Sequence, residues 1–255
     1  MFNILANMPD DLLGGALYIV TKYWPLLWNG VKYTLLIAFV GTLVGLVIGL
    51  FIGGIRAIKI SETDKPLVKI GKKLLYFITS VYIEVFRGTP MMVQAAFIYY
   101  TFKQTFNWTA LVAGMVVVSI NTGAYMAEII RSGIQSVPKG QNEAALALGM
   151  NNIKTMMFII LPQAIRNAFP SIGNEFVVNI KDSCVLNIIS VTELFFQTSS
   201  VGGTLMRIED AYLVAAVIYF ILTFTTTRIL AVIEKKLNMP VSKGVSSQTV
   251  PTNLS

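Results

Sequence analysis

The stretch YTLLIAFVGTLVGLVIGLFIGGI, residues 33–55, runs for 23 residues without a charged side chain. A helix that crosses the hydrocarbon core of a bilayer needs about 20 mostly apolar residues. The stretch is therefore long enough to span a membrane as one helix. We predict that it does so, which assigns the chain to the integral membrane proteins.

The composition of the whole chain agrees with this assignment. Of its 255 residues, 55% are hydrophobic and 13% are charged, and the mean hydropathy is +0.67. Soluble domains carry about 25% charged residues. A soluble core of this size could not bury so many apolar side chains, so we set aside the alternative of an unusually apolar soluble protein.

Two residue types that serve many enzyme sites are scarce. The chain has no histidine, which is the commonest general base and metal ligand, and its one cysteine is Cys184. A single cysteine excludes an intrachain disulfide. The sequence therefore argues against a histidine-based catalytic site, a metal centre and a disulfide scaffold.

Further apolar stretches predict four more spans. One of them is interrupted by RGTP at residues 87–90, and there we predict one long helix that bends near Pro90 and has a partly interfacial first half. Residues 184–192 are apolar but too short to cross. The four stretches are 74–102, 109–130, 155–172 and 212–230. We therefore predict an all-α polytopic membrane bundle of about five transmembrane helices.

The basic residues indicate which ends of these helices face the cytoplasm, because cytoplasmic loops are enriched in Lys and Arg. The loops 56–73 and 131–154 and the tail from residue 228 carry 13 of the 20 basic residues. We therefore place these segments in the cytoplasm, the N-terminus outside and the C-terminus inside. The net charge of +7 then reflects membrane topology rather than a nucleic-acid partner.

This topology divides the chain into three parts. Residues 1–30 form an N-terminal extracytoplasmic segment, and residues 31–235 form the transmembrane domain with its cytoplasmic loop 131–154. Residues 236–255 follow as a tail, of which residues 241–255 contain Ser, Thr, Val and Pro and have little amphipathic pattern. We expect them to form a disordered cytoplasmic tail.

The most specific motif of the sequence follows in that loop. Residues 143–162 read EAALALGMNNIKTMMFIILP. EAA stands at 143–145, three residues separate it from Gly149, and nine more separate Gly149 from I-x-L-P at 159–162. This resembles the EAA motif, EAA-x3-G-x9-I-x-LP, of the permeases of ATP-binding-cassette (ABC) importers. Every fixed position matches at the family's spacing. The alternative is an ordinary loop helix that packs on its own bundle.

The local chemistry of the motif predicts a compact helix-turn-helix. The good helix formers from Glu143 to Leu148 favour a short helix. Gly149 can take the left-handed conformation that ends it. A second short helix then leads into the span 155–172.

The resemblance implies the type I ABC importer, MetI-like permease fold. In that family the short helix is a coupling helix, which sits in a groove of the ATPase subunit and transmits its motion to the membrane helices. Here Glu143 would offer an anionic contact, and small alanines would allow close approach. The residues to which the resemblance gives this role are Glu143, Ala144, Ala145 and Gly149.

Other stretches narrow the resemblance to the polar amino-acid permeases, of the histidine, glutamine, arginine and opine type. They are EVFRGTP at residues 84–90, AYMAEIIRSGI at 124–134, and Lys181-Asp182-Ser183 followed by Glu193-Leu194. The resemblance covers about residues 25–235. The chain departs from the family at Cys184 and Asn187, where small hydroxyl residues are commoner.

Charged and polar residues between apolar stretches are the candidates for substrate contact, because such residues in a membrane domain are often functional. Lys181 and Asp182 suit the carboxylate and the ammonium group of an amino acid, and Ser183 and Asn121 are the further candidates. Two alternatives stay open. Lys181 and Asp182 can pair with each other, and Asn121 can join helices as a polar contact.

Three more charged residues have structural interpretations that we favour. Arg87, in the RGTP stretch, suits a hinge near the lipid headgroups. Glu128 and Arg131 are three residues apart near the cytoplasmic end of a helix, where such residues can pair.

The chain has no nucleotide-binding motif. Gly71-Lys72-Lys73 lacks both the upstream glycine and the following Ser or Thr of a Walker A sequence. The resemblance therefore implies that this chain binds no cofactor and that ATP and Mg²⁺ bind a separate ATPase dimer. It also implies a second permease subunit, identical or paralogous, and an extracytoplasmic solute-binding protein, in a bacterial cell membrane.

The predicted function is thus a non-catalytic importer subunit for polar amino acids that works by alternating access. One rival is a self-sufficient secondary carrier or channel, which often has inverted repeats; we see none in this sequence. Another is a scaffold or sensor subunit that transports nothing. A third keeps the importer but changes the cargo to methionine, a metal or an oxyanion, against which the EVFRGTP and Lys-Asp-Ser stretches argue.

Overall fold

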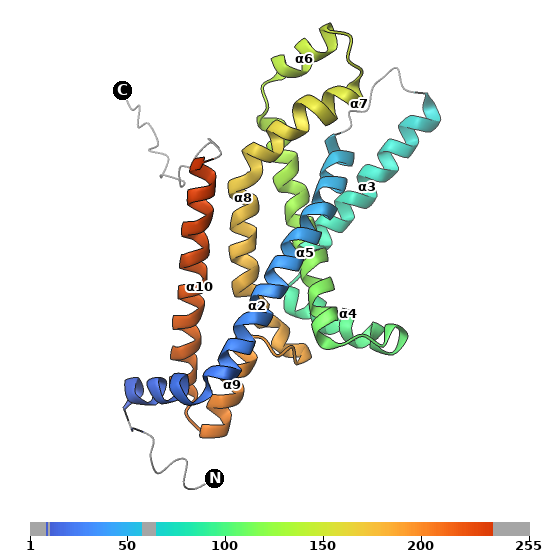
Figure 1. Cartoon of the computed structure of the whole chain (residues 1–255). Helices are drawn as coiled ribbons and strands as arrows, with labels where there is room; N and C mark the ends of the chain where they lie inside the picture. The colour runs from blue at the N-terminus through green and yellow to red at the C-terminus, as the bar shows by residue number, and fades with distance from the viewer. Residues whose placement is uncertain (1–8, 10, 58–64, 237–255) are drawn as a thin grey trace, which may run out of the picture.

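The computed structural model describes residues 9, 11–57 and 65–236. In this part of the chain every regular element is a helix (Figure 1). The elements are α2 (Leu12–Ala57), α3 (Pro66–Gly88), α4 (Met91–Phe106), α5 (Ala110–Ser136), α6 (Lys139–Ala147), α7 (Asn152–Thr155), the π-helix η1 (Met156–Ile160), α8 (Leu161–Asp182), the 3₁₀ helix η2 (Ser183–Ile189), α9 (Leu194–Leu205) and α10 (Ile208–Lys236).

Long apolar helices dominate the described residues. Helices α2, α5 and α10 are each long and apolar enough to cross a membrane. The run Asn152–Ile189 makes a fourth candidate together with α9, from which it is bent by 55°. Four of the five predicted spans fall on these helices, which confirms the all-α polytopic membrane bundle.

The predicted second span has a different form. Instead of one helix bent near Pro90, the chain makes two helices, α3 and α4, separated by extended backbone at Thr89 (φ −121°, ψ 147°) and Pro90 (φ −64°, ψ 132°). Proline has no N–H to continue a helix and disfavours helical backbone at the residue before it. Helix α3 also carries Lys69, Lys72 and Lys73. Its crossing of the membrane as a fifth span stays a prediction.

Helix α2 is twice as long as the span predicted inside it, with 46 residues. Tyr23 has a non-helical conformation (φ −111°, ψ 15°) two residues before Pro25, so the helix is kinked there. In Figure 1 its first turns run across one end of the bundle and the rest passes through it. Residues 1–8, 10 and 237–255, which include most of the predicted tail, lie outside the described residues.

A row of glycines brings α2 into close contact with α5. A Cβ atom on Gly45 would lie 2.8 Å from a side-chain carbon of Thr122, and one on Gly49 would lie 2.7 Å from the backbone carbonyl carbon of Met126. Small residues at such an interface let the backbones of membrane helices approach. The row consists of Gly41, Gly45, Gly49 and Gly53.

A buried carboxylate joins three helices near the middle of α2. Glu193 caps α9 by accepting hydrogen bonds from the backbone N–H groups of Phe195 and Phe196 at 3.0 and 2.8 Å. It also accepts from the hydroxyl of Tyr219 on α10 at 2.6 Å and from that of Thr34 on α2 at 3.5 Å. A buried carboxylate is tolerated when its oxygens are hydrogen-bonded in this way.

The close contact between α2 and α5 predicts that two glycine substitutions on α2 differ in their effect on thermal stability. Gly49→Ala should lower the thermal midpoint of the detergent-solubilised protein, because overpacking a tight contact costs about 1–3 kcal/mol. Gly54→Ala is the matched control, because nothing lies within 4 Å of a Cβ atom at that position. Equal midpoints for the two variants, measured by fluorescence-detected size-exclusion after heating, would contradict the contact.

Candidate substrate cavity and coupling loop

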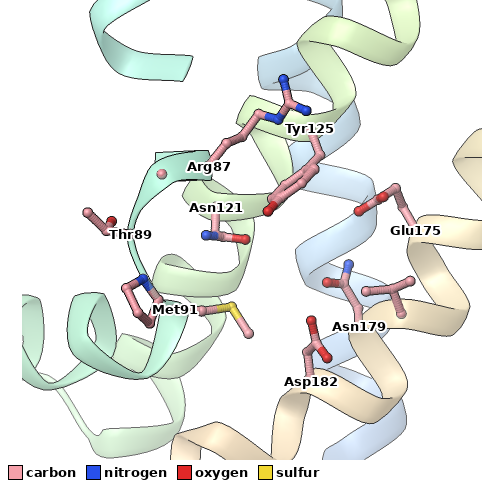
Figure 2. Close-up of a pocket in the computed structure, with 11 residues that line it drawn as sticks. Arg87, Thr89, Met91, Asn121, Tyr125, Glu175, Asn179 and Asp182 are labelled. Atoms are coloured by element: carbon pink, nitrogen blue, oxygen red, sulfur yellow. The ribbon is translucent and has the colours of Figure 1, made fainter. Parts of the chain in front are cut away.

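A cavity of about 560 Å³ lies between the break after α3, helix α5 and helix α8. The break contributes residues 87–91, and α5 contributes Asn121 and Tyr125. From α8 come three polar residues at the spacing that places side chains on one helix face. These are Glu175, Asn179 and Asp182, which Figure 2 shows turned toward the same space as Tyr125 and Asn121.

The cavity has charges of both signs. Glu175 and Asp182 bring two carboxylates, and Arg87 brings one guanidinium group. The guanidinium carbon of Arg87 lies 5.2 Å from the ring centroid of Tyr125, within the range of a cation–π contact. The lining therefore holds one more carboxylate than cation and offers partners for both ends of a zwitterion.

Asn179, which also lines the cavity, is held by neighbouring helices. Its Nδ2 donates to Thr42 Oγ1 of α2 at 2.8 Å, and its Oδ1 accepts from the hydroxyl of Thr122 on α5 at 3.0 Å. The residue therefore ties α8 to both α2 and α5 at the level of the cavity.

A second hollow of about 400 Å³ adjoins the first and follows α5 and α8 toward the loop that joins them. Arg87, Tyr125 and Glu175 line both hollows. Apart from Ile129, the rest of the second hollow's lining is small or polar, and two of these residues, Ser136 and Asn167, are joined by a hydrogen bond of 2.8 Å. The two hollows together form one polar path along α8.

The four predicted substrate residues are not all brought to this path. Asp182 and Asn121 line the first cavity. Ser183 is fully buried and donates its hydroxyl to the carbonyl oxygen of Ile180. Lys181 lines a different cavity of about 320 Å³, and between it and Asp182 no ion pair is formed among the described residues. Successive helical residues point about 100° apart, so three neighbours cannot face one cavity.

Sequence reasoning missed Glu175 and gave Arg87 a different role. The predicted span ended at residue 172, which put Glu175 in an extracytoplasmic loop, whereas α8 continues to Asp182. The signal was present, because Glu175 lies among apolar residues of a membrane domain, and such carboxylates are often functional. Arg87 was interpreted as a hinge residue near the headgroups, and it lines both hollows.

The predicted pair of Glu128 and Arg131 is confirmed and belongs to a larger network. Arg131 Nη2 lies 2.7 Å from Glu128 Oε2, and the same carboxylate also pairs with Arg56 of α2. The guanidinium carbon of Arg56 lies 5.0 Å from the ring centroid of Tyr76 on α3. This network joins α2, α3 and α5 near the loop end of the second hollow.

The loop of the EAA motif forms the predicted helix-turn-helix. Gly149 has φ +83° and ends α6. The N–H of Met150 donates to the carbonyl oxygen of Ala145 at 3.1 Å, and that of Gly149 to Leu146 at 3.0 Å, which is the Schellman pattern of a glycine-terminated helix. Asn151 Oδ1 then caps α7 by accepting from the N–H of Lys154 at 2.8 Å.

The surface that this loop presents differs from the predicted one. Glu143, Ala144 and Gly149 are exposed, but Ala145 is only 5% exposed and packs within the chain. The large apolar side chains of Leu148 and Ile153 are 85% and 71% exposed. Figure 1 shows α6 and α7 together at one end of the molecule, beyond the long helices.

In the described residues no group of three or more His, Cys, Asp or Glu side chains is arranged to hold a metal ion.

Residues 70–239 match the family of the binding-protein-dependent transport system inner membrane component. The chain belongs to this family. Over 245 residues the permease is 36% identical to the L-cystine transport system permease protein TcyB of Bacillus subtilis (strain 168). This alignment covers 94% of this chain and 99% of TcyB. It is 36% identical over 218 residues to the glutamine transport system permease protein GlnP of Escherichia coli (strain K12), covering 84% and 94%.

Solved structures agree with the sequence relatives. The crystal structure of an amino acid ABC transporter with histidines has a chain that is 37% identical to the permease, with a TM-score of 0.75 and coverage of 90% of this chain and 100% of that one. The inward-facing MetNI methionine ABC transporter, at 19% identity and a TM-score of 0.66, shares the fold. These matches confirm the predicted ABC importer, MetI-like permease fold.

The cavity geometry predicts which neighbouring positions of the permease water can reach. In a Cys184→Ala background, Asp182→Cys should react with a water-soluble methanethiosulfonate, because Asp182 lines the open cavity. Ser183→Cys should stay unmodified, because Ser183 is fully buried. Intact-protein mass spectrometry measures the extent of reaction, and equal modification of the two positions would contradict the placement of α8.

Proposed function

We propose that the permease carries a polar amino acid along the path beside α8 as the membrane subunit of an ABC importer. The observation that carries the proposal is the charged cavity inside an apolar helical bundle, with Arg87 on one wall and Glu175 and Asp182 on another. Ionisable groups are costly in such an environment and are kept there for function. The names of the relatives, permeases for cystine, glutamine and arginine, support the same class of cargo.

The chemistry of the cavity suits an amino-acid zwitterion. A guanidinium group binds a carboxylate with paired, charge-assisted hydrogen bonds. Arg87 would therefore hold the α-carboxylate, and Glu175 and Asp182 would hold the ammonium group. The spare carboxylate favours a neutral or cationic amino acid over an acidic one. The volume of about 560 Å³ is within the common size range of ligand cavities.

The proposed energy source is a separate ATPase dimer that binds ATP and Mg²⁺ and docks on the loop between α5 and α8. Its contact surface would be exposed Glu143 and Ala144 together with the apolar side chains of Leu148 and Ile153. Ala145 would support α6 from within, and Gly149 would fix the turn. In this proposal the loop lies in the cytoplasm, and the importer also contains a second permease subunit and an extracytoplasmic solute-binding protein.

Transport would proceed by alternating access between two conformations. ATP binding by the partner would favour the outward-facing state, and hydrolysis would restore the inward-facing one. A ligand shifts such an equilibrium only as far as its affinities for the two states differ. The loaded solute-binding protein and the ATPase would each supply such a difference at opposite ends of the bundle.

If the loop couples the permease to the ATPase, the Gly149→Val variant should no longer co-purify with the ATPase. A β-branched residue at φ +83° is strained by at least about 1–2 kcal/mol, so the turn between α6 and α7 should open. Glu143→Ala should weaken the same contact. The ratio of ATPase to permease after purification in mild detergent, by quantitative mass spectrometry, reports both effects.

Gly140→Ala is the matched control for these variants. It lies on α6, and nothing lies within 4 Å of a Cβ atom there, so it should retain the ATPase. Full recovery of the ATPase by Gly149→Val would refute the coupling role. Uptake that needs an ion gradient and no ATPase would refute the importer and favour a secondary carrier.

The cavity predicts that Asp182→Asn and Glu175→Gln each slow amino-acid uptake about tenfold or more, since hydrogen bonds to charged groups are worth about 1.5–3 kcal/mol. Lys181→Gln should keep nearly full uptake because Lys181 lies outside the path. Initial rates with radiolabelled L-glutamine, L-arginine and L-cystine, normalised to the amount of permease in the membrane, provide the measurement. A loss confined to Lys181→Gln would reverse this assignment.

A further inference from the structure

Gln94 is a buried amide at the wall of the substrate cavity, but it does not line the cavity. It lies in the first turns of α4, is 8% exposed, and its side chain reaches back to the break between α3 and α4. Its Nε2 lies 3.0 Å from the carbonyl oxygens of Phe86 and Thr89 and 2.8 Å from Thr89 Oγ1. One amide group therefore donates hydrogen bonds both to the last turn of α3, at Phe86, and to the extended residue Thr89 that follows it.

The other end of the same amide fixes a residue of the cavity. Gln94 Oε1 accepts from Asn121 Nδ2 of α5 at 2.9 Å, and Asn121 Nδ2 also donates to the carbonyl oxygen of Phe86 at 3.0 Å. A side-chain amide has two N–H donors, so both donors of Asn121 are engaged. Its Oδ1 remains, and Figure 2 shows this oxygen turned toward the cavity.

The orientation of Asn121 decides the polarity of this part of the cavity. With Oδ1 inward, Asn121 adds a hydrogen-bond acceptor to the carboxylates of Glu175 and Asp182. With Nδ2 inward it would add a donor instead. Three acceptor groups around one space suit an ammonium group, whose N–H bonds are all donors.

We propose that Gln94 is a positioning residue, which holds Asn121 with Oδ1 toward the cavity and so prepares an acceptor-lined subsite for a substrate ammonium group. It touches no substrate itself. Without its amide, the carbonyl oxygen of Thr89 would lose its partner and Asn121 could turn over. This inference rests on the proposed function, because it assumes that the cavity binds an amino acid.

The test is direct binding of radiolabelled L-arginine, L-glutamine and L-cystine to the purified permease–ATPase complex by scintillation proximity, without a solute-binding protein. Gln94→Met keeps the length of the side chain and removes its hydrogen bonds. We expect its Kd to rise about tenfold, because Asn121 Oδ1 is no longer held toward the ammonium group and one hydrogen bond to a charged group is worth about that factor. Gln94→Glu keeps an oxygen that accepts from Asn121 and should bind more tightly than Gln94→Met.

Tyr82→Phe is the control that removes a hydrogen bond between α3 and α5 without touching the cavity. Its hydroxyl donates to the carbonyl oxygen of Ile120 at 2.6 Å and thus also joins α3 to α5, at a place that lines neither hollow. We expect Tyr82→Phe to bind like the wild type. A double variant of Gln94→Met with Asn121→Ala should bind no more weakly than the weaker single variant, because the two residues act as one unit.

The outcomes separate this inference from the function beneath it. A wild-type complex that binds amino acid while Gln94→Met binds equally well, or loses no more than Tyr82→Phe, overturns the positioning role alone. Additive losses in the double variant do the same. A wild-type complex that binds none of the three amino acids overturns the proposed substrate site and this inference with it.

Discussion

Helix α2 lies against α5 at a distance that glycine alone allows, and the other elements are placed relative to this pair. In a bilayer the lipid is as apolar as the side chains, so helix association depends on close packing and on hydrogen bonds between helices. Helix α5 makes a second close approach at Gly133, where a Cβ atom would lie 2.6 Å from the carbonyl oxygen of Ala164 on α8. Helix α5 is thus fixed on both sides, between α2 and α8.

Buried polar groups then fix the register of these helices. The amide of Asn179 joins α8 to α2 and α5, and the carboxylate of Glu193 joins α9 to α2 and α10. Without water in the bilayer core, each such group must find its partner within the protein. The walls of the cavity are therefore set by a few hydrogen bonds whose loss leaves an unpaired group, and the proposed role of Gln94 follows the same rule.

The sequence predicted the parts of the fold that depend on local pattern. The length of the apolar stretches predicted four of the spans, and the EAA motif with Gly149 at its fixed spacing predicted the helix-turn-helix. The sequence did not fully predict which residues line the cavity, because that depends on three-dimensional placement. Lys181, Asp182 and Ser183 are neighbours in sequence but point to different surroundings. Glu175 was missed because the predicted span ended too early, and Gln94 because nothing local connects it with Asn121, 27 residues away.

The I-x-L-P end of the EAA motif lies in a continuous helical run that begins with α7. Pro162 has no N–H, and Leu161 donates to the carbonyl oxygen of Met156 five residues back, so the chain passes through the π-helix η1 directly into α8. From Asn152 to Asp182 this run spans about 45 Å at the rise of a helix. In the proposed mechanism, motion at α7 therefore reaches the carboxylates of α8 through continuous helix. The facing wall, at the break after α3, is tied to α5 by Gln94 and Asn121, and α8 is tied to α5 by Asn179, so hydrogen bonds connect both walls of the cavity to the same helix.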